Sequence, residues 1–420
     1  MPSLPLELWR DVLRELAYLP NILQKGYEPY TADCVDFDEL EYSTEVQSWR
    51  QDKRNAVLVC KTWRSLALPM LYEILFISDS RASRRILKAL EFATVDGFPD
   101  RGTFVRQIYI HVHWAGMSLW PGEGRNVGEH LARIIERCPH LAILTYRMYA
   151  DSDILRSAFD AIRMSSAARS LRKLDLCDNP VFWNPIFWEL ASEAIGQLPM
   201  LETLVIPPTI KFRQDHSLGI PRMPTRAMHA SHLKALVIPP EAYELMLSHI
   251  SELDMPMLHA IHVFPLAEIS PAFMQHSSAE RDWMNGKVTT IGFGHSVWTS
   301  TDLHKGFQFL AHFPNLQYTH LAVDELSQPD LPLEHSSLIC IAIVQNRSIK
   351  DPYSVPEEMV LSATTSIEVI LAGRFPKLGK VKIVGFYAER YNKGRTEQIA
   401  EWTRRLGERG IALEFSRTFQ

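Results

Sequence analysis

The stretch from Ser170 to Asn179 constrains the fold most strongly, because its sequence SLRKLDLCDN has the spacing Leu-x-x-Leu-x-Leu-x-x-Asn. Side chains alternate along a strand, so Leu174 and Leu176 share one face and Lys173 and Asp175 share the other. One such unit cannot bury its apolar face alone. The spacing therefore predicts stacked neighbours of the same kind.

The same core spacing, that of a leucine-rich repeat, recurs along the chain with weaker residues. The first positions of successive copies lie between 22 and 40 residues apart, which brackets the usual repeat length with loops added. The further copies are Val105/Ile108/Ile110, Leu141/Leu144/Tyr146, Leu201/Leu204/Ile206, Leu233/Leu236/Ile238, Leu258/Ile261/Val263, Val288/Ile291/Phe293, a damaged copy at Leu316/Thr319/Leu321, Leu338/Ile341/Ile343 and Leu378/Val381/Ile383.

Five of these ten copies are entered through Pro-x-Leu, where a proline ends the preceding helix and favours an extended path. Chance is the alternative in a chain with 26 prolines, but it does not explain why the five stand in register with the predicted strands. The pattern predicts an α/β solenoid over residues 78–420, with a curved parallel sheet and outer helices. The prolines are Pro139, Pro199, Pro256, Pro314 and Pro376.

Bulk properties narrow the class of protein. The formal net charge is -5, which gives no broad basic field for nucleic acid or an anionic membrane. The five cysteines stand singly, without a C-x-x-C pair, so neither a disulfide framework nor a zinc site is expected. No apolar run approaches eighteen residues, which argues against a membrane span. We expect a cytoplasmic or nuclear protein without metal or cofactor.

The N-terminal 77 residues have a different pattern. Residues 4–16 predict a helix, and residues 20–53 carry eight acidic and three basic residues with poor periodicity, which indicates a mobile acidic loop. From Arg54 the chain predicts a helix over the Ala56 to Cys60 run, a second from Trp63 to Leu71, and a strand at 74–77.

Two segments here resemble an F-box, the helical module that docks a substrate receptor onto the Skp adaptor of SCF-type cullin ubiquitin ligases. They are Leu4-Pro5-x-Glu7-Leu8 and Val59-Cys60-Lys61-x-Trp63-Arg64-x-Leu66-Ala67, and the later Pro69-x-Leu71-Tyr72-Glu73 resembles F-box-like proteins with irregular leucine-rich repeats. The resemblance implies a three-helix F-box-like module over 1–77 and adaptor binding by Leu4, Pro5, Leu8, Val59, Trp63 and Leu66, the last three also packing the module.

The acidic insertion departs from the family, whose first two helices are joined by a handful of residues. The adaptor is expected to be acidic, so this loop should lie away from it. The alternative is that residues 1–77 only seal the end of the solenoid, as a terminal repeat must.

Strand alternation predicts which side chains line the concave face of the sheet and hold a protein target. The alternative is that a covering loop such as 211–225 hides the middle of this face. The candidate target-binding residues are Tyr109, His111, Arg147, Lys173, Asp175, His262, Phe264 and His320.

No catalytic motif is present: the sequence has no G-x-S-x-G, no phosphate-binding glycine loop and no nucleophile with an evident base. His111 and His113, or His259 and His262, lack a carboxylate or cysteine companion for a metal. We therefore expect a non-enzymatic substrate-recognition subunit of an SCF-type ligase, which binds the Skp adaptor, through it the cullin ligase, and an unknown protein target. A repeat scaffold without a ubiquitin role is the alternative.

Overall fold

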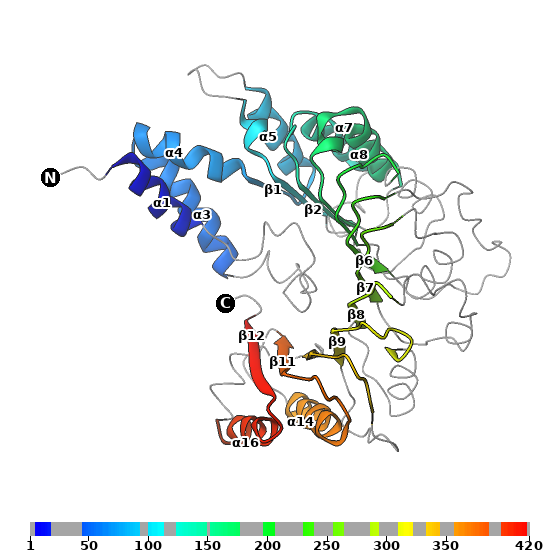
Figure 1. Cartoon of the computed structure of the whole chain (residues 1–420). Helices are drawn as coiled ribbons and strands as arrows, with labels where there is room; N and C mark the ends of the chain where they lie inside the picture. Colours follow the sequence, from blue (N-terminus) through cyan, green and yellow to red (C-terminus); the bar gives the residue numbers. More distant parts are fainter. Residues whose placement is uncertain are drawn as a thin grey trace. The chain divides into compact units, whose positions relative to one another are not determined.

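The computed structural model in Figure 1 describes residues 5–17, 44–92, 100–112, 123–148, 152–176, 196–205, 230–238, 255–263, 286–293, 310–321, 333–344, 357–385 and 396–417. These residues fall into two compact units. The first holds the described residues up to Leu233 together with Met255 and Pro256, and the second holds the described residues from Lys234 onward apart from those two.

The first unit begins with three helices and continues with strands separated by helices. The α-helices are α1 (Leu6–Ala17), α3 (Thr44–Val59), α4 (Lys61–Tyr72), α5 (Ser80–Glu91), α7 (Glu123–Glu136) and α8 (Ser152–Met164), and the 3-10 helices are η2 (Arg101–Phe104) and η3 (Ser166–Arg169). The strands are β1 (Ile74–Ile77), β2 (Gln107–Val112), β3 (Ile143–Met148), β4 (Lys173–Asp175) and β5 (Thr203–Val205).

The second unit consists of strands and two helices within the part that the structure describes. Its strands are β6 (Ala235–Ile238), β7 (Ala260–Val263), β8 (Thr290–Phe293), β9 (Tyr318–Leu321), β10 (Cys340–Val344), β11 (Lys380–Gly385) and β12 (Ala412–Arg417). Its helices are α14 (Glu357–Ala372) and α16 (Thr396–Gly407).

The strands follow one another in chain order, β1 to β12, in a parallel sheet, as the repeats predict. The register aligns the predicted core positions: Ile108 lies opposite Leu144, and Leu144 opposite Leu174. In the second unit Ile291 lies opposite Thr319, and Thr319 opposite Ile341. The damaged copy therefore occupies its place in the sheet.

The first position of each repeat anchors the turn before its strand. These residues are all buried, and four of the turns that start with a residue before proline close with a hydrogen bond from the leucine N–H, as from Leu141 to the Cys138 carbonyl. Proline thus fills the second position of a turn, where its fixed φ is favourable. The buried first positions are Val105, Leu141, Leu171, Leu201, Leu233, Leu258, Val288, Leu316, Leu338 and Leu378.

Helices α5, α7 and α8 lie side by side on one face of the sheet in the first unit (Figure 1). Helix α7 shows why: Val127, Leu131, Ile134 and Ile135 recur at helical spacing and are fully buried. The α/β solenoid character expected from the sequence is therefore present in this unit.

Helix α3 begins nine residues before the expected end of the acidic loop, which corrects the predicted boundary at residue 53. Trp49 and Lys53 are one turn apart and both are buried, so they anchor the front half of the helix. The ammonium of Lys53 lies 3.7 Å from the centroid of the Trp49 ring. A buried lysine is not counted in an apolar pattern, so the sequence did not show this stripe.

Candidate docking site

Helix α1 has an apolar arc wider than the strip that its neighbours cover. Leu13 is fully buried and Trp9 is half-buried against the other two helices, whereas Leu8 and Val12, one turn apart, remain 48% and 41% exposed. Charged residues Glu7, Arg10, Asp11, Arg14 and Glu15 occupy the opposite side of the helix. The covered strip holds the helix in place, and the uncovered edge is available to another surface.

The end of α3 adds further exposed apolar side chains. Leu58 is 80% exposed and Val59 is 59% exposed, directly before the short turn into α4. Cys60 caps α4, since its Sγ accepts a hydrogen bond from the Trp63 N–H at 3.5 Å. The cap satisfies a backbone N–H at the start of α4 and stabilises the beginning of that helix.

A small core binds α1, α3 and α4 into one group, the N-terminal helical module. Leu13, Ala56, Leu66 and Ala67 form its buried centre, with Trp63 among the half-buried residues packed around it. The rings of Trp9 and Trp63 join the front of α1 to the front of α4, with 5.0 Å between their centroids. The front of α1 therefore lies beside the turn that carries Leu58 and Val59 (Figure 1).

We call the exposed apolar residues at this end of the module the docking face. Five large aliphatic side chains on α1 and at the end of α3 are each between 41% and 80% exposed, which is unusual for a small helical group. Full burial of one such side chain stabilises an interface by about 1.5–3 kcal/mol, so completing the burial of five half-exposed ones contributes roughly 5 kcal/mol before the costs of association. The docking face consists of Leu6, Leu8, Val12, Leu58 and Val59.

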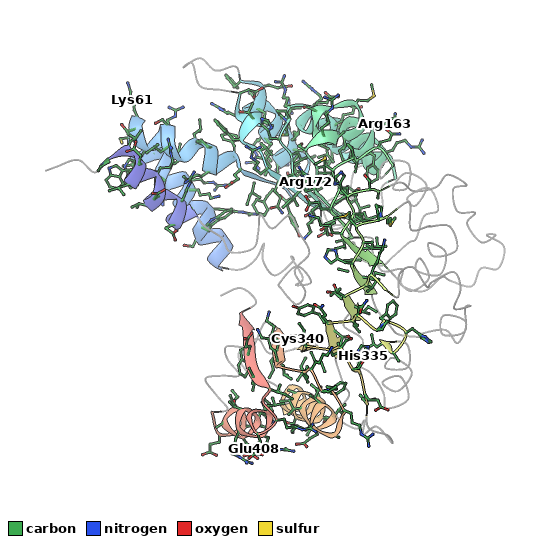
Figure 2. The ribbon with its side chains drawn as sticks, viewed as in Figure 1. Lys61, Arg163, Arg172, His335, Cys340 and Glu408 are labelled. Carbon is green, nitrogen blue, oxygen red and sulfur yellow. The ribbon has the colours of Figure 1, made fainter. Side chains whose placement is uncertain are left out.

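Cations lie next to the docking face. Arg54, Lys61 and Arg64 are exposed on α3 and α4, and Figure 2 shows Lys61 at the start of α4. Acidic Asp11 is paired with Arg14 on α1 at 3.6 Å. The rim along α4 is therefore basic, which suits a partner with negative charge around an apolar centre.

A buried lysine joins α3 to the far end of α4, next to the sheet. The Lys53 ammonium donates a hydrogen bond to the Met70 carbonyl at 3.0 Å. Burial lowers the pKa of Lys53 to about 8, against the opposing effect of the Glu73 carboxylate. Burial likewise raises the pKa of Glu73, against the effect of Lys53. The bond from Lys53 to Met70 fastens α3 to the end of α4, where the Glu73 carbonyl accepts hydrogen bonds from the Arg106 and Gln107 N–H groups at the start of β2.

The predicted adaptor-binding residues divide between surface and core. Pro5, Leu8 and Val59 are exposed, Trp63 is half-buried, and Leu66 is buried in the module core. Leu4 lies outside the described residues. Sequence reasoning missed Leu6, Val12 and Leu58 as surface residues. The apolar run Val57-Leu58-Val59 at a helix end was the available signal, since such a run cannot all face one core.

The predicted target-binding face is covered where its side chains are described. Tyr109, Lys173 and Asp175 are 1%, 6% and 2% exposed, so they are not open to a target protein. Tyr109 packs against Phe76, and the Arg50 guanidinium of α3 lies 3.7 Å from the centroid of the Phe76 ring. Alternation along the strands did not show that Tyr109 packs against Phe76 or that Arg50 of α3 lies over the Phe76 ring. The backbone of four other predicted residues is described but their side chains are not: His111 of β2, Arg147 of β3, His262 of β7 and His320 of β9. Phe264 lies outside the described residues.

The second unit has an open depression of about 710 Å³ at the entrance to its last strands. Arg374, Arg409 and Glu334 contribute charges of both signs, and Arg409 donates to the Leu371 and Gly373 carbonyls at the end of α14. His335 is buried beside it and bonds the Leu310 carbonyl through Nε2 at 3.0 Å; burial lowers the pKa of this imidazole. Arg409 and His335 are engaged by backbone carbonyls, so the depression is a weaker candidate than the docking face.

Among the described residues, no three histidine, cysteine or acidic side chains are grouped as a metal site requires. No helix in the described ranges has the length and apolar character needed to cross a membrane.

Comparisons with known proteins assign no family. No protein-family model matches the chain, and no curated protein matches it. Among solved structures, the chain is similar to a crystal structure of a Bacteroides fragilis protein determined as a structural-genomics target. The identity is 10%, with a TM-score of 0.33, over 82% of this chain and 75% of that one.

Proposed function

We propose that the chain is the substrate-recognition subunit of an SCF-type ubiquitin ligase, with the docking face as the site for the Skp adaptor. The observation that carries this proposal is the exposure of Leu8, Leu58 and Val59 on a three-helix group whose sequence resembles an F-box. An apolar face of this kind on a module with so small a core is explained by a partner that covers it.

The charges at the rim support the same partner. Lys61 and Arg64 stand exposed on α4 beside the docking face, and the adaptor is expected to be acidic. Opposite charges around an apolar centre speed association and select the orientation. The subunit would act by proximity, because it holds a target near a cullin-bound conjugating enzyme and raises the local concentration of target lysines.

One observation favours the alternative of a repeat scaffold without a ubiquitin role. Strand β1 follows α4 directly and pairs with β2, with Ile74 opposite Gln107. The module is thus continuous with the sheet, as a terminal cap of a solenoid would be.

Co-expression with the Skp adaptor and gel filtration separates the two functions. The full chain should co-elute with the adaptor, and Leu8→Ala with Leu58→Ala should abolish co-elution while the circular dichroism spectrum stays unchanged. The matched control is Leu361→Ala with Met257→Ala, two residues that are also about half exposed but lie in the second unit. Separate elution of the unmodified chain would leave the scaffold function.

Alkylation of Cys60 gives an independent map of the contact. Cys60 is exposed next to the docking face, whereas Cys138 and Cys340 are buried, which raises the pKa of their thiols to about 12 and about 11. Mass spectrometry after iodoacetamide treatment should show Cys60 modified in the free chain and protected in the complex. Equal modification in both would place the adaptor elsewhere.

A further inference from the structure

Helix α5 has one buried and one exposed face of opposite character. Ser83, Leu87 and Leu90 are buried. The helix is fixed at its start by Asp79, whose Oδ1 accepts a hydrogen bond from the Ala82 N–H at 2.6 Å, and at its end by the Phe92 N–H, which donates to the Lys88 carbonyl. The exposed face is therefore held in a defined orientation.

Four cations line this exposed face, at positions three and four apart. We call Arg81, Arg84, Arg85 and Lys88 the cationic stripe; all four are exposed. Residues at these spacings are neighbours on a helix, so the stripe places like charges side by side. Within the described part of the chain, the side-chain bond seen for the stripe runs from Arg85 Nε to the Arg81 carbonyl, and no carboxylate forms an ion pair with it.

Several exposed arginines elsewhere in the described residues do have carboxylate partners. On α16, Arg404 forms ion pairs with Glu401 and Glu408, and Arg405 pairs with Glu368. Glu91, the last residue of α5, forms an ion pair with Arg133 of α7. This carboxylate therefore does not neutralise a cation of the stripe. The stripe is thus a local excess of positive charge on a chain whose net charge is -5.

The positive charge of the stripe also affects a histidine on the neighbouring helix α7. His130 of α7 lies 3.1 Å from the Ser83 hydroxyl, measured from its Nδ1. Burial lowers the pKa of His130, and the charges of Arg133 and Arg84 lower it further.

We propose that the cationic stripe of α5 is a docking surface for an acidic polypeptide segment, separate from the docking face and independent of the ubiquitin proposal. Guanidinium groups bind carboxylates through paired hydrogen bonds, and three of the four cations are arginines. A polypeptide fits better than nucleic acid, because the stripe covers a single helix and the net charge of -5 gives no broad basic field for a phosphate backbone. A membrane surface fits less well, because the apolar face of α5 is buried in the unit and cannot insert.

Fluorescence anisotropy with a labelled polyglutamate peptide and the full chain tests this proposal. Reversal of two charges, Arg84→Glu with Lys88→Glu, should weaken binding by about tenfold or more, and added salt should weaken binding to the unmodified chain. The matched control is Arg374→Glu with Lys377→Glu, two exposed cations of the second unit, and it should bind as the unmodified chain does. Equal weakening by both pairs would overturn the proposal, because the effect would then be one of net charge.

Three further binding measurements distinguish an acidic polypeptide from other ligands of the stripe. Tighter binding of duplex DNA or of phosphatidylserine vesicles than of the peptide would overturn the polypeptide assignment. A peptide of glutamine should not bind. The chain itself has seven acidic residues between Glu28 and Val46. If changing them to amides tightens peptide binding by about tenfold or more, that segment is the occupant and an external partner is excluded.

Discussion

The indole rings of Trp9 and Trp63 meet at a centroid distance of 5.0 Å and an interplanar angle of 56°. This tilted contact is one of the favourable geometries for aromatic pairs. It is the point at which the first helix of the chain is tied to α4, whose Cys60 cap and preceding turn present Leu58 and Val59. The residues that pack the module core therefore lie next to the residues of the docking face. Single substitutions can test the stability of the core and binding by the docking face separately.

Removal of one ring should destabilise the module, whereas removal of an exposed leucine should not. Trp63→Ala deletes a half-buried ring from the module core, and we expect a loss of about 2–4 kcal/mol in the free energy of unfolding. Leu58→Ala, at a position 80% exposed, should change the free energy by less than about 0.5 kcal/mol and still weaken adaptor binding. Urea unfolding followed by tryptophan fluorescence and circular dichroism measures both. Equal destabilisation by the two variants would contradict the division between core and docking face.

Stability should depend on pH through Lys53. Its pKa is lowered from 10.5 to about 8 in the folded chain, so the unfolded chain binds the proton more tightly and stability rises as pH increases from 8 to 10.5. The full shift corresponds to about 3 kcal/mol as an upper bound. In Lys53→Met, which keeps an unbranched side chain, this rise should disappear.

The measurement compares unfolding free energies of the two proteins at about pH 7 and about pH 10, so that titrations shared by both cancel. A rise of the same size in Lys53→Met would show that other groups cause it.

Substitution of Thr319 by valine should increase the stability of the folded chain. It is fully buried at a core position, and its hydroxyl has no hydrogen-bond partner among the described residues. Thr319→Val keeps the shape and removes an unsatisfied polar atom, so we expect a gain of about 1–2 kcal/mol in stability. Thr289→Val is the control, because the Thr289 hydroxyl donates to the His259 carbonyl. Thermal unfolding should give a higher Tm for the first variant and an unchanged or lower Tm for the second.

Gly102 should not tolerate a methyl group. A Cβ at this position would lie 1.9 Å from the Arg137 carbonyl oxygen, which belongs to the segment leading into β3. Gly102→Ala should cost about 2–3 kcal/mol, because the backbone must move. Gly286→Ala, where no atom lies within 4 Å, is the matched control and should be nearly neutral. Hydrogen exchange of the β2 and β3 amides would show whether the loss is local to that contact.

The parallel sheet could be predicted from the sequence because the same core spacing recurs in every copy of the repeat. Leu171, Leu174 and Leu176 are each fully buried, and the first of these places is buried in every copy. Even Thr319 lies in register, since Leu316 before it is buried in its turn and the neighbours Ile291 and Ile341 fix the alignment.

What the sequence could not show depends on contacts between distant residues. Alternation assigns Tyr109 and Asp175 to one face of the sheet, but it does not show that Tyr109 packs against Phe76 or that Arg50 of α3 lies over the Phe76 ring. The start of α3 was missed for a related reason: Lys53 is buried by its bond to Met70 and its place over Trp49, neither of which is visible in a hydropathy pattern.

Among the described strands, each is bonded only to the strands that precede and follow it in the chain. No long-range pairing fixes the total number of repeats, so gene duplication or deletion could add or remove one strand and its connection without changing the register of the others. Such a scaffold can change its length over evolutionary time while the helices at its front end keep the same docking face.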